Sequence, residues 1–429
     1  MNSGLQQLGG VLTCRGLSLE GMAERFGTPL YVYDLRAIED RVGRFVSAFE
    51  GSPLLLAYSV KANGSLALLN RVGALGAGAD IVSLGELRRV LRAGIPSDRV
   101  VFSGVGKTEE ELIAGLNAGI YAFHVESSDE LELLSRVADR LEVSAPVSLR
   151  VNPDVDPPTP HEYTRTGHAA SKFGIPIFQA ESLYQSWADD PHLDFLGVGV
   201  HIGSQIVEIA PYVRALDTVL GMVDRLTKAG VGIDYVDLGG GFGIGYDGEA
   251  GLDLEGLASE VSPRLRERGL RLILEPGRSI VGEAGILLTR VLYTKRNVGK
   301  TFVITDGGMT ELLRPSYYGG FHRITPVRLR KEAPTVMADI VGPVCETGDF
   351  LARDREIALP EPGDVLMVET AGAYGFSMAS NYNARRRPAE VLIESGEAIL
   401  IRHRETTDDL MRGEEIPVSQ HDADVGDPG

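Results

Sequence analysis

Short apolar runs alternate with longer amphipathic stretches along the chain from about residue 36 to Glu275. The runs have the length of buried strands, and the stretches between them have the periodicity of helices that cover a sheet. Eight strand–helix units in about 250 residues are typical of a (β/α)8 barrel of the TIM type. An open doubly wound sheet remains an alternative, because periodicity does not show closure. The expected strands are Leu54–Tyr58, Ala79–Val82, Val100–Ser103, Tyr121–Val125, Val147–Val151, Leu196–Ile202, Tyr235–Leu238 and Leu272–Glu275, and the helical stretches include Gly85–Ala93, Thr108–Ala118 and Ser128–Arg140.

The pattern changes after Glu275, where helical periodicity fades and short β-rich runs separated by turn residues follow. We expect the earlier run Leu30–Asp34 to add a strand to the same region. The predicted fold is therefore an α/β barrel at residues 36–283 and a second, all-β domain, Greek-key or sandwich-like, formed by both chain ends (1–35 and 284–415). Residues 416–429 have the composition of a disordered acidic tail. The later runs are Thr301–Thr305, Pro334–Val341, Val365–Val368 and Val391–Ile401.

Composition narrows the class of protein. The 429 residues, 43% of them hydrophobic and 24% charged, are enough for two domains with large cores. The formal net charge of −18 argues against nucleic acid or an anionic membrane as a partner. Cys14 and Cys345 cannot build a disulfide scaffold and match no zinc motif, so no metal is expected. The chain shows no apolar run of about 20 residues and no signal-peptide pattern, so we expect a cytoplasmic enzyme.

Polar side chains follow most of the expected strands at their carboxyl ends, where barrel enzymes place their chemistry. Lys61 ends the first strand, and apolar surroundings can lower the pKa of a lysine and make its amine a nucleophile. Such an amine can form a Schiff base with an aldehyde cofactor, although a surface lysine is the plainer interpretation. The remaining strand-end groups are Asp80 with Ser83 and Glu86, Arg150 and Asn152, His201 and Ser204, Gly239–Gly241, and Glu275–Arg278.

Three of these features suit a cofactor that carries a phosphate. Gly239–Gly243 could be an ordinary tight turn, but glycine amides can also approach a phosphate closely. His201 could be a core histidine, yet its place just before Ser204 suits a flat ring over a cofactor with a hydroxyl on the phosphate. Glu275, if buried, needs a cationic partner, and a protonated pyridine nitrogen is one.

These motifs together resemble the fold-type III pyridoxal-phosphate decarboxylases, which share their barrel architecture with alanine racemase. The C-terminal half is similar to the diaminopimelate decarboxylases in particular. The resemblance runs from about Gly27 to about Arg402. It rests in the barrel on Tyr58–Asn63, Ser171–Gly174, His201–Gln205, Gly239–Gly243 and Glu275–Arg278, and beyond it on Asp306–Met309, Leu313–Tyr318, Gly342–Asp349 and Ala371–Gly375.

The resemblance implies a role for each matching residue. Lys61 carries pyridoxal 5'-phosphate, His201 stacks on its ring, and Glu275 pairs with the ring nitrogen. Cys345 is the proton donor and comes from the partner subunit of a homodimer with shared active sites. The implied cofactor-binding residues are Lys61, Asp80, His201, Ser204, Gly239, Gly240, Gly241, Glu275, Gly277, Arg278 and Tyr374, with Glu86 in support. The implied substrate-binding residues are Arg278, Arg314, Tyr318, Glu346 and Tyr374.

The implied reaction is decarboxylation of meso-2,6-diaminopimelate to L-lysine and carbon dioxide, the last step of lysine biosynthesis. Two arginines for the distal carboxylate and an acid for the distal ammonium suit a substrate with two amino-acid centres. The chain departs from the family pattern at Leu84, Gly307, Gly319 and Thr347, and the last two leave selectivity at the distal end less certain. A related decarboxylase of ornithine, arginine or a carrier-bound amino acid, a non-catalytic regulator and a racemase-like enzyme remain the alternatives.

Overall fold

The computed structural model describes residues 4–155, 157–161, 171–330 and 332–417. The barrel strands follow one another in parallel around a ring, and pairing of β8 with β9 and of β13 with β5 closes it. The closed barrel is confirmed, and the open-sheet alternative is wrong. Within the described residues the ring consists of β5 (Leu54–Ser59), β6 (Gly78–Ile81), β7 (Val100–Phe102), β8 (Ala122–Val125), β9 (Ala145–Asn152), β11 (Leu193–Val200), β12 (Tyr235–Asp237) and β13 (Arg271–Leu274), with β10 (Ile175–Pro176) beside β9.

Alternating side chains on these strands separate two apolar layers. A small cluster that includes Leu55, Tyr235 and Ile273 lies on one face of the strands. The alternate residues, such as Leu56, Val236 and Leu272, join the large core cluster that also contains the helices. These helices are α2 (Leu35–Ala48), α3 (Leu66–Ala74), α4 (Leu84–Arg92), α5 (Glu109–Ala118), α6 (Ser128–Leu141), α7 (Ile177–Ser186), α8 (Ala210–Lys228), α9 (Leu254–Arg266) and the short α10 (Arg278–Val281).

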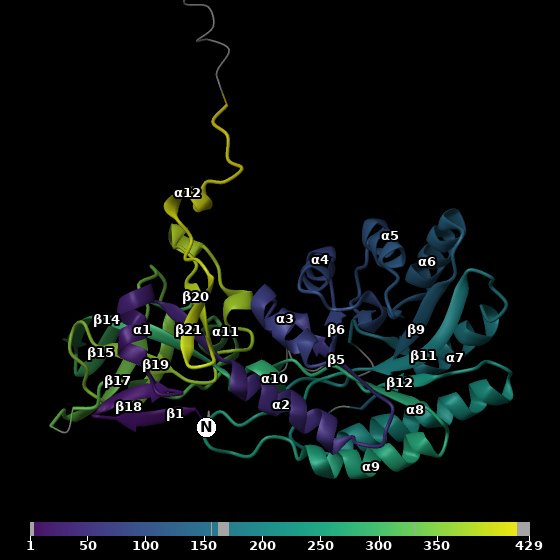
Figure 1. Ribbon diagram of the computed structural model, residues 1–429, viewed down its shortest axis with the longest axis horizontal. Helices are drawn as coiled ribbons and strands as arrows, with labels where there is room; N and C mark the ends of the chain where they lie inside the picture. The colour runs from purple at the N-terminus through teal and green to yellow at the C-terminus, as the bar shows by residue number, and fades with distance from the viewer. Residues whose placement is uncertain (1–3, 156, 162–170, 331, 418–429) are drawn as a thin grey trace, which may run out of the picture.

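A β-rich sheet lies beside the barrel, on the left of Figure 1. Its main path runs β18-β17-β15-β14-β4-β20-β21, so β4 from the N-terminal part lies between strands from the C-terminal part. The domain boundaries given above remain a prediction, and residues 418–429 of the expected tail lie outside the described residues. The strands are β4 (Leu30–Asp34), β14 (Gly285–Asn297), β15 (Lys300–Thr305), β16 (Ile324–Pro326), β17 (Thr335–Val341), β18 (Phe350–Ala358), β19 (Val365–Val368), β20 (Ala389–Glu394) and β21 (Glu397–Arg402).

Smaller elements complete the β-rich side. A three-stranded sheet forms at the start of the chain, and α1 packs against its second and third strands. No helix among the described residues is both long enough and apolar enough to cross a bilayer. The smaller elements are β1 (Leu5–Leu8), β2 (Val11–Cys14), β3 (Leu17–Ser18), α1 (Leu19–Phe26), α11 (Arg314–Tyr318) and α12 (Thr407–Leu410).

The sequence prediction is wrong at two points on this side. The run Val391–Ile401 is a hairpin, β20 and β21, rather than one strand. The long strand β14, the strands β16 and β18 and the short strands β1–β3 were not predicted. In β14 and β18 one part of the strand faces solvent, with exposed charged residues such as Lys295 and Arg353, and therefore has no apolar pattern.

The two regions meet at the carboxyl end of β5. The carbonyl oxygen of Ala62 accepts hydrogen bonds from the Tyr374 amide (2.8 Å) and the Ser377 hydroxyl (3.2 Å). The Asn63 side chain donates to the carbonyl of Gly372 (3.1 Å). These bonds fix a loop of the β-rich region against the end of the barrel, and they place the Tyr374 side chain beside Lys61.

Candidate active site

A cavity of about 550 Å³ opens at the carboxyl ends of the barrel strands. It also reaches residues of the β-rich region, which covers this end of the barrel. Eight of the predicted site residues line it: Lys61, His201, Ser204, Glu275, Arg278, Arg314, Tyr318 and Tyr374. A small adjoining pocket of about 40 Å³ adds Gly241 and Gly277 to the lining.

Lys61 lies in the short 3-10 turn that follows β5, and its ammonium contacts the neighbouring strand. Its Nζ is 2.5 Å from Oδ2 of Asp80, which is fully buried and also accepts from the Ser59 hydroxyl at 2.9 Å. Burial alone would lower the pKa of Lys61, but the charges of Asp80 and Glu275 outweigh burial and raise it. The expectation of a lowered pKa is therefore wrong in this structure, because register pairing of β5 with β6 sets an acid beside the amine.

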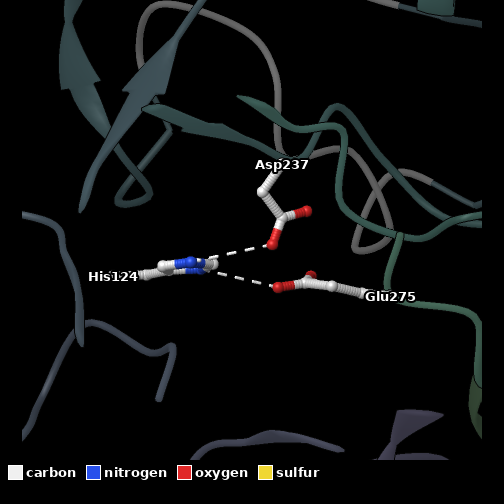
Figure 2. A group of neighbouring side chains, drawn as sticks. All are labelled: His124, Asp237 and Glu275. Carbon is white, nitrogen blue, oxygen red and sulfur yellow. Dashed lines mark ion pairs between the residues drawn. The ribbon is translucent and has the colours of Figure 1, made fainter. Parts of the chain in front are cut away.

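Glu275 is 6% exposed and faces a histidine that also faces a second acid. His124 stands between them, with Nδ1 3.6 Å from Glu275 Oε1 and Nε2 3.6 Å from Asp237 Oδ2 (Figure 2). Burial opposes the charge on Glu275, but the His124 ring and the Lys61 ammonium lower the pKa of Glu275 to about 2. Burial and the charge of Glu275 raise the pKa of Asp237 well above its usual value. Burial therefore favours the protonated form of Asp237, whereas the neighbouring His124 and Lys61 favour the anionic form of Glu275.

Neither His124 nor Asp237 was among the predicted site residues. Both lie at the carboxyl ends of barrel strands, His124 in β8 and Asp237 as the last residue of β12. Applying the strand-end rule to every strand would have found them. Ser103, after β7, completes this group: its Oγ lies 3.3 Å from His124 Nδ1 and donates to Glu275 at 3.4 Å.

His201 presents a neutral ring to the cavity. Its Nδ1 accepts a hydrogen bond from the Gly240 amide at 3.1 Å, which requires that nitrogen to carry no proton. Burial and the nearby charges of Arg150 and Lys61 lower the pKa of His201 to about 3. An uncharged flat ring fixed by the backbone suits stacking on an aromatic cofactor.

The glycine loop packs too closely for any side chain. A Cβ on Gly240 would lie 2.2 Å from the carbonyl oxygen of Glu275, and one on Gly241 would lie 2.1 Å from that of Gly203. The Gly239 amide donates to Asp237 Oδ1 at 2.6 Å, so the amides of Gly239 and Gly240 are both used within the protein. A phosphate role for these two amides remains a prediction, whereas Gly241 and Gly277 border the small pocket directly.

Two guanidinium groups line the cavity, that of the buried Arg314 and that of the partly buried Arg278. Arg278 donates to the Tyr246 hydroxyl (2.6 Å) and the Ser204 hydroxyl (3.2 Å). Arg314 is 8% exposed and hydrogen-bonded to His322. Among the described residues no carboxylate forms an ion pair with Arg278 or Arg314. Their positive charges therefore remain available to anionic groups in the cavity.

Cys345 and Glu346 do not line the cavity of their own chain. Both are exposed on the turn between β17 and β18, where the Cys345 amide donates to Asn383 Oδ1 at 3.1 Å. The buried Asp349 carboxylate holds this turn by accepting from the Val344 amide at 2.7 Å. Their contribution to a neighbouring chain's site remains a prediction.

Glu86 lies just outside the cavity, in the first turn of α4. Its carboxylate accepts from the Val82 amide at 2.8 Å. Burial, and to a lesser extent the charge of Asp80, raises the pKa of Glu86 to about 7, despite that hydrogen bond. Glu86 is therefore an acid beside the site whose charge changes near neutral pH.

The residues at this end of the barrel fit a phosphorylated pyridine aldehyde. Glu275 is an anion in position for a protonated ring nitrogen, and His201 is a neutral flat ring. The buried Nε of Arg278 has no hydrogen-bond partner in the described structure, and it lies at the small pocket that Gly241 and Gly277 border. Lys61 offers an amine to the aldehyde at the same end of the barrel.

Comparisons with known proteins agree with this geometry. The model of the pyridoxal-dependent decarboxylase, pyridoxal binding domain, matches residues 35–282. The diaminopimelate decarboxylase of Pseudomonas aeruginosa is 50% identical over 405 residues, which cover 94% of this chain and 97% of that protein. A solved diaminopimelate decarboxylase from M. jannaschii in complex with L-lysine has a TM-score of 0.92 at 37% identity, with 97% and 98% of the two chains covered. The diaminopimelate decarboxylase of Helicobacter pylori, also solved in complex with L-lysine, has a TM-score of 0.88 at 38% identity, and the match covers 92% of this chain and 98% of that chain.

Proposed function

We infer the activity of this chain from its family, because it belongs to the diaminopimelate decarboxylases, a group of pyridoxal-dependent decarboxylases. It is a carboxy-lyase that converts meso-2,6-diaminopimelate to L-lysine and carbon dioxide, the last step of lysine biosynthesis. The observation that carries this conclusion is a pair of arginines, Arg278 and Arg314, that form no ion pair with any acid in the described part of the chain and that line a cavity together with Lys61. A substrate with a second carboxylate supplies the missing anion.

The chain's own residues prepare the reacting end of the cavity. Lys61 would hold pyridoxal phosphate covalently, with its phosphate at Ser204, Gly241, Gly277 and Arg278. When bound, this cofactor acts as an electron sink for the bond that loses carbon dioxide. Glu275 would pair with the protonated ring nitrogen, and the His201 ring would stack on the cofactor. Asp80 stabilises the Lys61 ammonium and so would hold a proton at Lys61 Nζ.

The other end of the cavity recognises the unreacted amino-acid centre. Arg314 and Arg278 would bind its carboxylate, with the hydroxyls of Tyr318 and Tyr374 alongside. Glu346 from the partner chain would receive its ammonium. Ornithine and arginine lack the distal carboxylate, so they would leave the Arg314 charge buried and unpaired.

The deciding experiment measures carbon dioxide release by the holoenzyme. Meso-diaminopimelate, ornithine and arginine are each supplied as substrate, with and without added pyridoxal phosphate. Release from diaminopimelate alone, dependent on the cofactor, is the expected result. Faster release from ornithine or arginine would show that the chain is a related decarboxylase of that amino acid instead. No release from any of the three compounds would support a non-catalytic regulator with the same fold.

We propose further that two chains share each active site. Cys345, exposed and away from its own cavity, would protonate the product carbon in the partner's site, because a thiol can act as a general acid. Both cysteines are free, as suits the cytoplasmic location that we expect.

Mixed dimers test the shared site. Lys61→Ala and Cys345→Ala homodimers should each be weak or inactive. About half of randomly exchanged dimers are mixed, and each mixed dimer has one intact site of two, so the mixture should recover up to about a quarter of wild-type activity. Subunit exchange is verified by mass. Activity that stays at the sum of the two variants would refute the shared site.

A further inference from the structure

Arg314 is a buried cation that is oriented by a histidine instead of an acid. Its Nη1 lies 2.7 Å from Nε2 of His322, which is fully buried. The ring of Tyr246 lies under the guanidinium, 4.6 Å from its central carbon, and meets the His322 ring edge-on at 5.4 Å. Arg314, His322 and Tyr246 therefore pack together as one group, and this packing sets the position of the Arg314 guanidinium.

The hydrogen bonds of His322 permit one protonation state. An arginine side chain only donates hydrogen bonds, so Nε2 must accept and carries no proton. Nδ1 lies 2.9 Å from the carbonyl oxygen of Glu369, which only accepts, so Nδ1 must carry the proton. The ring is therefore neutral. Burial and the charge of Arg314 lower the pKa of His322 to about 3, so it stays neutral at any working pH.

A neutral acceptor has a consequence that a carboxylate would not have. An aspartate or glutamate at this place would also orient Arg314, but it would cancel the charge of the guanidinium. The neutral imidazole orients the guanidinium and leaves its charge for the cavity. The carbonyl of Glu369 fixes the ring from behind, so the second hydrogen bond of the ring also goes to an uncharged acceptor.

We propose that His322 is a positioning residue that fixes Arg314 while keeping its charge uncompensated, and that this sets selectivity for a substrate with a distal carboxylate. The inference rests on the proposed function for the identity of that substrate. It predicts that the charge of residue 322, more than its shape, decides the affinity for diaminopimelate.

A pair of variants of nearly equal shape separates charge from geometry. In His322→Gln the amide oxygen can still accept from Arg314, whereas in His322→Glu a carboxylate accepts in its place. We expect His322→Gln to raise KM for meso-diaminopimelate by no more than about threefold, and His322→Glu to raise it at least about tenfold, with kcat within about threefold of wild type in both. L-lysine keeps the carboxylate of the unreacted centre, so its inhibition constant should rise together with KM, whereas the inhibition constant of cadaverine, which has no carboxylate, should move by less than about threefold in either variant.

Several outcomes overturn the proposal. Equal KM values for the two variants would show that charge at residue 322 is irrelevant. A change in the cadaverine inhibition constant as large as the change in KM would show a general disturbance of the site. The visible cofactor band and the melting temperature show whether each variant keeps its fold and cofactor.

A second test applies if His322→Glu fails to fold. His322→Phe keeps a ring but removes both nitrogens, and it should raise KM in the presence of Arg314 and have little effect in the Arg314→Ala background. An equal effect in both backgrounds would show that His322 does not act through Arg314. If the wild-type holoenzyme releases no carbon dioxide from meso-diaminopimelate, the proposed function fails separately, and calorimetric titration of the same variants with this compound still tests His322.

Discussion

Replacing Gly241 with alanine should damage the phosphate end of the active site through the backbone of a neighbouring turn. Gly241 has a φ of +88°, and its added Cβ would lie 2.1 Å from the carbonyl oxygen of Gly203. That atom belongs to the main chain and cannot turn aside as a side chain can. Gly203 precedes Ser204, so relief of the clash must move the hydroxyl that we expect on the phosphate.

Gly248 provides a control with the same backbone strain and no clash. Its φ is +90°, and nothing lies within 4 Å of its added Cβ. Alanine at a left-handed position costs about 1–2 kcal/mol, which applies to both variants. Overpacking adds about 1–3 kcal/mol to Gly241→Ala alone. The expected destabilisation is therefore about 2–5 kcal/mol for Gly241→Ala and about 1–2 kcal/mol for Gly248→Ala.

The affinity for pyridoxal phosphate is the sharper measurement. If about 1.4 kcal/mol of the overpacking energy opposes phosphate binding, the Kd of Gly241→Ala for pyridoxal phosphate rises about tenfold. The Kd of Gly248→Ala stays near the wild-type value. Titration of the apoprotein, followed by the visible absorbance of the bound cofactor, gives both constants, and thermal melts give the stability. Equal cofactor affinity in the two variants would show that the close packing of Gly241 on Gly203 does not shape this pocket.

Three further predictions concern residues on or beside the cavity wall. Lys61→Ala should abolish turnover because no amine can then hold the cofactor, and borohydride reduction with peptide mapping should place the label on Lys61; a label on another lysine would contradict the assignment. Arg314→Ala should raise KM for diaminopimelate strongly, because losing one side of a charge-assisted contact costs about 2–5 kcal/mol; unchanged kinetics would refute the distal-carboxylate role. The raised pKa of Glu86 means that its protonated form stabilises the fold, fully below about pH 4.5 and progressively less as pH rises to about 7. As pH rises from about 4.5 to about 7, the free energy of unfolding of the Glu86→Gln apoprotein should therefore increase by up to about 3 kcal/mol relative to wild type, as measured by thermal melts. Parallel stability–pH profiles of the two proteins would contradict the burial argument.

The barrel could be predicted because its strands are buried on both faces. Such strands appear in the sequence as nearly continuous apolar runs, and each of the eight predicted runs overlaps an observed barrel strand. The β-rich side was predicted less completely for the converse reason. The outer half of β14 faces solvent, and the hairpin turn at Ser395 and Gly396 interrupts the apolar pattern between β20 and β21 only over the four residues Glu394–Glu397.

The position of the site could also be predicted, because the strand-end rule turns positions along the sequence into one place in space. Lys61, His201 and Glu275 line one cavity as that rule requires. The charge state of these groups could not be predicted in this way. The sequence suggested a lowered pKa for Lys61, and the contact with Asp80 reverses it.

The sequence by itself therefore determined which residues lie inside the barrel and at which end the chemistry gathers, since local periodicity and strand direction encode both. Only the tertiary structure decided the electrostatics: the acid beside Lys61, the histidine between two buried acids, and the neutral partner of Arg314. The physical reason is that Coulomb and desolvation energies depend on atomic distances and burial, which the packing of distant segments sets.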